Sequence, residues 1–320
     1  MNDLPRPFAA GGVSVGVHPT SGGRPGEALE QVFAQARAAD RAGYDGVTIS
    51  EHHGGAGGGG YLPNPMAVAG WLLPELSRAW AAAAPLLLPL RNPNLVIEEI
   101  AWLAARFPGR TGLCVGPGFA PIDFEVAEVP LEDRQPRFRS GVRRLAAAFA
   151  GDAPVPLRGD PAVLALSAGA VPLVATLGGP AGARSAGRAG VGAMVDSFAS
   201  AEKAKSLFEV YVEAGGTGPR ILCRRAWLGE PDPARMQSLA RSYGGIGASA
   251  AIGPPQTDFI ATTDVAEMAR QLAESVRETG ADALLIRFHF QGVSQVAMEE
   301  QLTETGMRML PHLRRELDWA

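Results

Sequence analysis

Hydrophobic positions along the chain repeat a unit in which an amphipathic helix ends at a glycine and a short β-rich run follows. In the first copy, residues 29–36 carry apolar side chains at the i, i+3, i+4, i+7 spacing of one helix face, Gly43 ends the pattern, and residues 45–49 predict a strand. Strand, helix and strand in repetition predict parallel strands joined by right-handed crossovers. Three later copies have a glycine between helix and strand at Gly109, Gly190 and Gly280.

Eight β-rich runs of this kind predict eight strands. They lie at residues 13–17, 45–49, 82–88, 113–115, 173–177, 193–195, 220–223 and 283–286. Eight parallel strands close as a (β/α)8 barrel, whose functional residues stand at the carboxyl ends of the strands. A doubly wound open sheet stays open as the alternative, but no GxGxxG follows the first strand, so its nucleotide-binding version is disfavoured.

The longest interruption of the pattern is the segment 226–263, which is rich in Gly, Pro, Ser and Ala and has helical spacing only at residues 233–243. Long insertions over a barrel mouth are commonly lids. We therefore expect this segment, with its glycine-rich stretch 244–247, to be the most mobile part of the free protein and to become ordered when a ligand binds. No linker divides the chain, which predicts one barrel domain over residues 1–320.

The charge and the cysteine content limit the classes of ligand and partner that the protein is expected to bind. The chain has 29 Lys and Arg residues against 33 Asp and Glu, a net charge of −4, which disfavours nucleic acid and anionic lipid and favours a small molecule. Cys114 and Cys223 stand far apart without a CxxC spacing, which argues against a disulfide framework and a zinc site. The start of the chain has no signal pattern, and prolines break the longest apolar run, residues 81–90, so we expect a cytoplasmic protein without a membrane span.

A chemical motif stands at the end of the second predicted strand, where Ser50, Glu51, His52 and His53 precede a run of glycines. Packing explains an isolated histidine pair as well as function does, but the place at the carboxyl end of a barrel strand favours function. Neighbouring residues on an extended strand point to opposite faces and chelate one ion poorly, so we predict no metal site.

Five stretches in the same order along the chain resemble the bacterial luciferase-like flavin-dependent monooxygenase family. They are residues 43–53 with the Glu-His-His motif, 88–93, 107–119, 173–190 and 280–313. The resemblance implies a reduced flavin, usually FMN supplied by a separate reductase, that reacts with oxygen to a hydroperoxide shielded from water, while the protein supplies shape and protons.

The resemblance also assigns roles around the flavin. It makes His52 the general acid or base beside the ring, which suits an imidazole. Glu51 belongs to the same catalytic group, and two roles stay open for it: orienting a neighbouring side chain or capping the barrel rim. His53 is expected to lie behind the site or to be packed in the structure. The flavin phosphate is expected on backbone N–H groups at Gly178, Gly179 and the next helix, with a plain turn as the alternative. Further flavin contacts are expected at Gly116, Ala183, Arg184 and Ser185.

Some positions depart from the family pattern. Relatives have hydroxyl and acidic side chains where this chain has Gly178, Gly179 and Gly182, and an arginine where it has Pro117. The resemblance therefore predicts weaker phosphate binding, because fewer side chains contact the phosphate. Arg184 and Ser185 are candidate replacements, although a solvated surface charge accounts for Arg184 equally well.

The Ala84–Pro85 peptide in the third strand is expected to be cis. In the family the aligned peptide is a cis bond between non-proline residues, and it forms a bulge beside the flavin ring. A proline at the second position makes the cis form less costly, and a proline inside a buried strand by itself implies a bulge.

Four further side chains are candidates for the substrate pocket: His18, His53, Phe119 and His289. His18 ranks above His289 because Pro19 marks the exit of the first strand directly after it. A purely structural place stays open for both histidines.

Two other functions stay open. A deazaflavin-dependent oxidoreductase would bind 8-hydroxy-5-deazaflavin through a similar glycine-rich turn and transfer hydride without oxygen. A catalytically idle flavin-binding or partner subunit is favoured by the weakened phosphate grip and opposed by the retained Glu51-His52-His53. The resemblance also implies a homodimer through helices near the second and third barrel units, whereas the substrate has no readable code in the loops.

Overall fold

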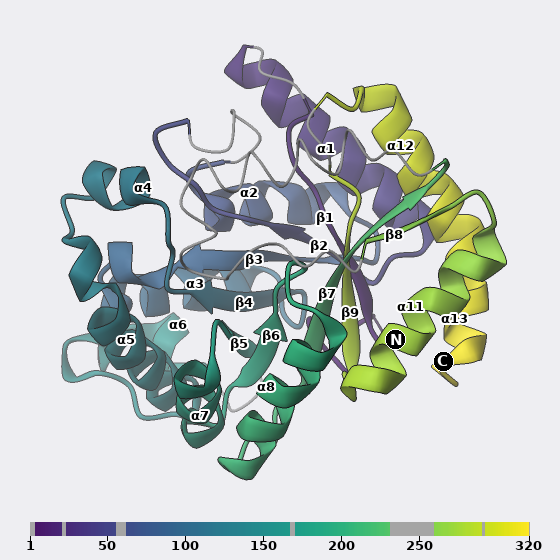
Figure 1. Cartoon of the computed structure of the whole chain (residues 1–320). Helices are drawn as coiled ribbons and strands as arrows, with labels where there is room; N and C mark the ends of the chain where they lie inside the picture. The colour runs from purple at the N-terminus through teal and green to yellow at the C-terminus, as the bar shows by residue number, and fades with distance from the viewer. Residues whose placement is uncertain are drawn as a thin grey trace.

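Eight parallel strands close into a barrel (Figure 1). The computed structural model describes residues 4–20, 24–55, 62–166, 170–230, 259–289 and 292–319. Neighbouring strands pair in chain order, and the last one, β9, pairs with both β7 and β1, which closes the ring. The predicted (β/α)8 barrel is therefore confirmed. Its strands are β1 (Val13–Gly16), β2 (Gly46–Ile49), β3 (Trp80–Leu87), β4 (Thr111–Gly116), β5 (Leu173–Thr176), β6 (Gly192–Val195), β7 (Arg220–Leu228) and β9 (Ala283–Arg287).

Helices cover the outside of the strands (Figure 1). A π-helical turn, Thr305–Met309, joins the last two of them, and α12 packs beside α1. The helices are α1 (Pro25–Ala42), α2 (Pro65–Leu72), α3 (Pro93–Arg106), α4 (Pro121–Val126), α5 (Arg134–Phe149), α6 (Pro161–Leu164), α7 (Pro180–Ala189), α8 (Ala201–Glu213), α11 (Val265–Thr279), α12 (Gln295–Glu304) and α13 (Leu310–Glu316).

Glycines end three of the four helices whose ends were predicted. Gly43, Gly190 and Gly280 have φ values of 94°, 67° and 67°, the left-handed conformation that glycine adopts without a steric penalty. The fourth helix, expected to stop near Gly109, ends a few residues earlier. Helix α3 already ends at Arg106, and Gly109, with φ of 72°, lies in the turn before β4.

Apolar side chains fill the barrel interior toward the amino ends of the strands. Phe8 packs on Trp80 with ring centroids 4.9 Å apart, and a Cβ on Gly46 would fall 2.1 Å from the Trp80 ring, so only glycine fits there. Cys114 and Cys223 are free and belong to this interior cluster, and burial raises the pKa of both thiols. Protonated thiols inside an apolar barrel are structural side chains.

The segment 226–263, predicted to be a lid, begins and ends in regular structure. Strand β7 continues to Leu228, and an extra short strand, β8 (Ile260–Thr262), pairs with it in parallel. The predicted bounds were therefore too wide, because the two ends satisfy each other's backbone groups. Residues 231–258, which include the predicted helix and the glycine-rich stretch 244–247, lie outside the described residues. Of the described helices, none is both long and apolar enough to cross a membrane.

Candidate active site

A bulge interrupts β3 at its carboxyl end. The Ala84–Pro85 peptide is cis, which confirms the prediction, and the pairing of β3 with β4 shifts register between Ala83 and Leu86. The carbonyl oxygen of Ala84 accepts a hydrogen bond of 2.9 Å from the Ser50 hydroxyl. The bulge is thereby tied to the strand that carries the Glu-His-His motif.

Gly116, at the end of β4, lies directly against this bulge. A Cβ at Gly116 would stand 3.0 Å from Cβ of Pro85 and 3.1 Å from the hydroxyl oxygen of Thr176 on β5. A larger residue would therefore push the proline or the β5 side chain away. The predicted cofactor contacts Ala84, Pro85 and Gly116 are thus brought together at one place on the barrel rim.

His52 is paired with a buried carboxylate. Its Nδ1 lies 2.9 Å from Oδ2 of Asp123, whose other oxygen accepts the backbone N–H of His53 at 2.7 Å. Asp123 is fully buried in the first turn of α4, and the Phe119 ring stands edge-on to His52 with centroids 5.6 Å apart. Because a carboxylate only accepts, it holds the His52 proton on Nδ1 and makes Nε2 the proton-accepting nitrogen.

Sequence reasoning did not single out Asp123. The residue lies 71 positions from His52, in the first turn of a six-residue helix, and neither fact marks it out. The one available signal was its place just after the glycine-rich exit of β4, at the same rim of the barrel.

Glu51 points away from the barrel interior and is surrounded by donors. Its Oε2 accepts the backbone N–H of Leu87 at 2.5 Å, and its Oε1 accepts from Arg91 at 2.5 Å and from Nε2 of His53 at 2.9 Å. The carboxylate is buried, while Arg91 is 21% exposed. Glu51 therefore ties the exit of β2 to the turn after β3, and His53 is the third member of this network.

Two further predicted pocket residues follow β1 and β9, the next two strands beyond β2 in the ring. The rings of His18 and His289 are 5.1 Å apart; His18 is buried and His289 is half-buried. Burial lowers the pKa of His18 well below its usual range, with His289 and Arg287 adding to the effect. Burial, with Arg225 and Arg287, lowers the pKa of His289 to about 4. Both imidazoles are therefore neutral at neutral pH.

These lowered pKa values predict a stability that falls on acidification. Between pH 6.5 and about 4 the native protein binds fewer protons at His289 than the unfolded chain does, so its unfolding free energy rises with pH in this window. The slope reaches at most about 1.4 kcal/mol per pH unit for each histidine. Urea unfolding at pH 5, 6 and 7 should show a smaller slope in His289→Asn, while the exposed His312→Asn keeps the wild-type slope. Equal slopes in wild type and His289→Asn would contradict the assignment.

Three glutamines hold the chain where it leaves β1. Gln35 accepts from the backbone N–H of His18 at 3.1 Å and donates to its carbonyl at 2.7 Å, and Gln31 accepts from the N–H of Thr20 at 2.9 Å. Gln295, at the start of α12, accepts from Gln35 at 3.1 Å and donates to the carbonyl of Gln31 at 3.2 Å. The imidazole of His18 is thus fixed through its own backbone.

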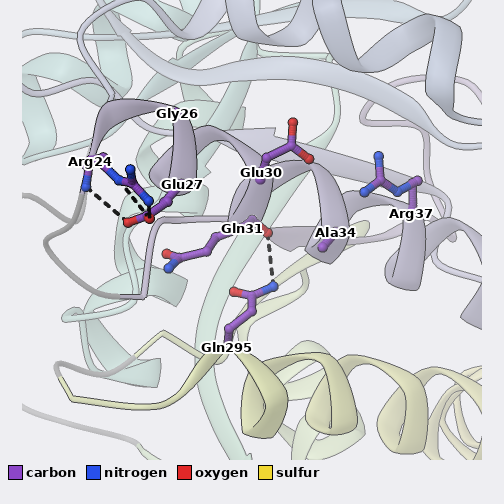
Figure 2. Close-up of a pocket in the computed structure, with 8 residues that line it drawn as sticks. All are labelled: Arg24, Gly26, Glu27, Glu30, Gln31, Ala34, Arg37 and Gln295. Atoms are coloured by element: carbon purple, nitrogen blue, oxygen red, sulfur yellow. Dashed lines mark hydrogen bonds and ion pairs between the residues drawn. The ribbon is translucent and has the colours of Figure 1, made fainter.

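The outer side of this glutamine cluster faces a hollow of about 820 Å³ between the starts of α1 and α12 (Figure 2). Figure 2 shows Gln31 and Gln295 bonded to each other and the Arg24–Glu27 pair at the start of α1. Charged side chains of both signs line it, and it lies outside the barrel. The hollow therefore carries none of the residues of the Glu-His-His network.

The turn from β5 into α7, predicted to hold a phosphate, is open. Within the described chain, a Cβ on Gly178, Gly179 or Gly182 would meet no atom within 4 Å. Arg184 is exposed and Ser185 half-buried, whereas the side chain of Ala183 is buried in the core and its N–H donates to the Gly179 carbonyl. The turn therefore offers space and helix-start N–H groups, while Ala183 points away from it. No cluster of three metal-ligating side chains occurs among the described residues.

Comparison with known proteins gives a family match over most of the chain. A family model described as luciferase-like monooxygenase matches residues 9–282. No curated protein matches the chain.

Several solved structures have a similar fold. The monooxygenase RslO1 from Streptomyces bottropensis has 18% identity and a TM-score of 0.76, over 94% of this chain and 99% of that one. An F420-dependent secondary alcohol dehydrogenase in complex with an F420-acetone adduct has 22% identity and a TM-score of 0.73, over 95% and 99%. The oxygenating constituent of 3,6-diketocamphane monooxygenase from Pseudomonas putida, in complex with FMN, has 18% identity and a TM-score of 0.70, over 94% and 98%. At these identities the likeness shows the barrel fold.

Proposed function

Because the chain belongs to the luciferase-like monooxygenase family, we propose that it is an FMN-dependent monooxygenase acting on a small organic substrate. The observation that carries the proposal is the buried His52–Asp123 pair at the carboxyl end of β2, beside the Ala84–Pro85 bulge. This rim is where barrel enzymes place their chemistry. A separate flavin reductase would supply the reduced cofactor.

The residues present fit a flavin. The open space above Gly178, Gly179 and Gly182, together with the N–H groups at the start of α7, suits a phosphate, because the helix dipole favours an anion there. The bulge at Pro85, close to His52, suits the ring system. When bound, reduced flavin would supply the electrons that activate oxygen.

The chain's own groups would position and move protons. His52 would exchange a proton at Nε2, because Asp123 holds the other nitrogen in its protonated form. Glu51 acts as a positioning residue, since its oxygens are engaged by Arg91, His53 and the backbone of the β3 turn. Phe119 covers one edge of His52 and limits the access of water.

A deazaflavin-dependent hydride-transfer enzyme is the second candidate. It is supported by the same open glycine turn at the start of α7, which suits the phosphate of either cofactor and has no side chain that selects one of them. A non-catalytic flavin-binding subunit is disfavoured by the complete His52–Asp123 pair, because burying a carboxylate costs free energy and such pairs gather at catalytic sites.

Titration of the purified protein with FMN, reduced FMN and 8-hydroxy-5-deazaflavin, followed by fluorescence quenching, tests these functions. The proposal expects binding of reduced FMN to be tighter than binding of deazaflavin, and substrate-dependent oxygen consumption when a reductase is added. Preferential binding of deazaflavin would instead identify the hydride-transfer enzyme. Binding of either flavin with no turnover of any kind would favour the non-catalytic subunit.

A homodimer through α2 and α3 is also proposed. Large apolar side chains are exposed on both helices, Trp71 (54%) on α2 and Leu95 (54%) and Trp102 (53%) on α3, and a Cβ on Gly70 of α2 would lie 3.2 Å from the Leu103 side chain of α3. An exposed apolar surface of this kind marks an association site. Trp71→Glu combined with Leu95→Glu should therefore give a monomer in analytical ultracentrifugation. Val296→Glu, on α12 and 66% exposed, is the control that should leave the dimer intact, and a wild-type monomer would contradict the proposal.

A further inference from the structure

Two guanidinium groups are buried beside each other on the inner wall of the barrel mouth. Arg225 on β7 and Arg287 on β9 are partners in the strand register and are 2% and 4% exposed. Arg225 stands two positions after Cys223, and Arg287 two positions after Leu285; both of these earlier residues belong to the interior cluster. Side chains alternate along a strand, so both arginines point into the barrel.

Two imidazoles complete this corner of the mouth. His18 Nε2 and Cγ of Arg287 lie 3.2 and 3.3 Å from the position that a Cβ on Gly16 would take, so both occupy the space above that glycine. Arg225 donates to the carbonyl of His289 at 3.1 Å, and the His289 ring contacts that of His18. Side chains from β1, β7 and β9 therefore converge at one point.

Two of the four groups at this corner are permanently charged. Arginine keeps its proton in proteins, whereas burial and the two guanidiniums lower the pKa of His18 and His289, which makes these rings neutral. An acid, Asp196, follows β6 nearby, where its Oδ1 accepts from the backbone N–H of Phe198 at 3.1 Å. A guanidinium on the inner wall presents several N–H donors in one plane, and the oxygens of an anion accept from donors arranged in this way.

We propose that Arg225, Arg287, His18 and His289 form a subsite for an anionic group of the substrate, a carboxylate or an equivalent oxyanion. The inference rests on the proposed function, because it assigns the substrate of the same site. A planar guanidinium matches the two oxygens of a carboxylate, and neutral imidazoles can add N–H donors. Arg287 also donates to Ser50 at 3.0 Å and reaches the Ala84 carbonyl at 3.5 Å, so the subsite adjoins the bulge.

The phosphate of the flavin is the other anion to which this chemistry is suited. The open turn at Gly178 and Gly179 follows β5, whereas the arginines stand on β7 and β9, on another part of the ring. The geometry therefore points to separate places for the two anions, with the substrate group on the β7–β9 side.

Calorimetric titration with benzoate, and with neutral benzamide as its matched analogue, tests the subsite in the full-length protein. Benzoate should bind at least about 10-fold more tightly than benzamide, and Arg225→Gln should lose at least about 10-fold of the benzoate affinity. Arg270→Gln removes the same charge from the exposed face of α11 and should leave benzoate affinity unchanged. Equal binding of the two probes, or no binding of benzoate by wild type, would overturn the subsite.

Arg287→Lys is the second variant, because it keeps the charge and loses the planar fork, and it should also weaken benzoate binding. Retained benzoate affinity in both variants overturns the proposal. Titrations with FMN and riboflavin distinguish the sources of the anion. If Arg225→Gln weakens FMN binding but not riboflavin binding, the corner takes the flavin phosphate and the substrate assignment is wrong. If the wild-type protein binds FMN but not benzoate, the subsite is refuted and the proposed function stands. If it binds benzoate but no flavin, the proposed function is refuted and the subsite stands.

Discussion

Replacing His52 by alanine should lower turnover by about 100-fold or more, because general acid–base catalysis by a positioned side chain contributes roughly this much. The ring is 8% exposed and lies at the rim rather than in the apolar interior, so the fold should persist. FMN affinity should stay close to wild type, since the phosphate turn lies on another strand. The checks are kcat under saturating reduced flavin, the Kd for FMN and the circular dichroism spectrum.

The exposed His312 provides the control for this experiment, because His312→Ala removes an imidazole from the outer helix α13 and should leave kcat unchanged. Asp123→Asn should lower kcat by about 10-fold, as expected when a residue that orients another loses its charge. Its diagnostic readout is the ¹⁵N NMR spectrum of His52, which should show the Nδ1–H tautomer in wild type and a mixture in the variant. Wild-type turnover in His52→Ala would refute its role in proton transfer.

Glu51→Ala should have the largest effect on stability, a loss of about 3 kcal/mol in the free energy of unfolding, because the half-buried Arg91 would lose its ion-pair partner and a buried backbone N–H its acceptor. The change leaves Arg91, His53 and the backbone N–H of Leu87 without the acceptor that they share. Urea unfolding at pH 7 gives the measurement. Glu51→Gln keeps one acceptor oxygen and should lose less.

Glu75→Ala is the matched control, since Glu75 is 44% exposed and its ion pair with Arg37 lies at the surface. Surface pairs of this kind contribute about 0–1 kcal/mol. If Glu51→Ala and Glu75→Ala changed the unfolding free energy equally, the Glu51 network would not hold the rim together.

The barrel could be predicted because its signals are local. Helical spacing, a left-handed glycine and a β-rich run lie within a few residues of each other, and Gly43, Gly190 and Gly280 were recognised in this way. The extra strand β8 could not be predicted. Its three residues form a strand only because Ile260 lies beside Ala226, and this pairing depends on the path of the chain between them.

The part of the site that lies at strand ends could also be predicted from the sequence. The Ser50–His53 motif and the Ala84–Pro85 bulge stood out because strand ends meet at one rim of a barrel. The partners that give the motif its chemistry, Asp123 and Arg91, come from other units at separations of 71 and 40 residues. Such contacts depend on how loops fold back over the rim, and alternation along β2 indicates only that His52 and Glu51 point to opposite sides.

The pairing of β1 with β9 has a consequence for synthesis on the ribosome. Val13 lies beside Leu284, so one edge of the first strand stays unpaired until the last strand, β9, has been synthesised. Until residues 283–287 emerge, the nascent chain exposes strand edges at β1 and at the growing end, and unpaired edges invite association with other chains. Translation speed near the end of the message and access to chaperones should therefore decide how much of this protein reaches its native state.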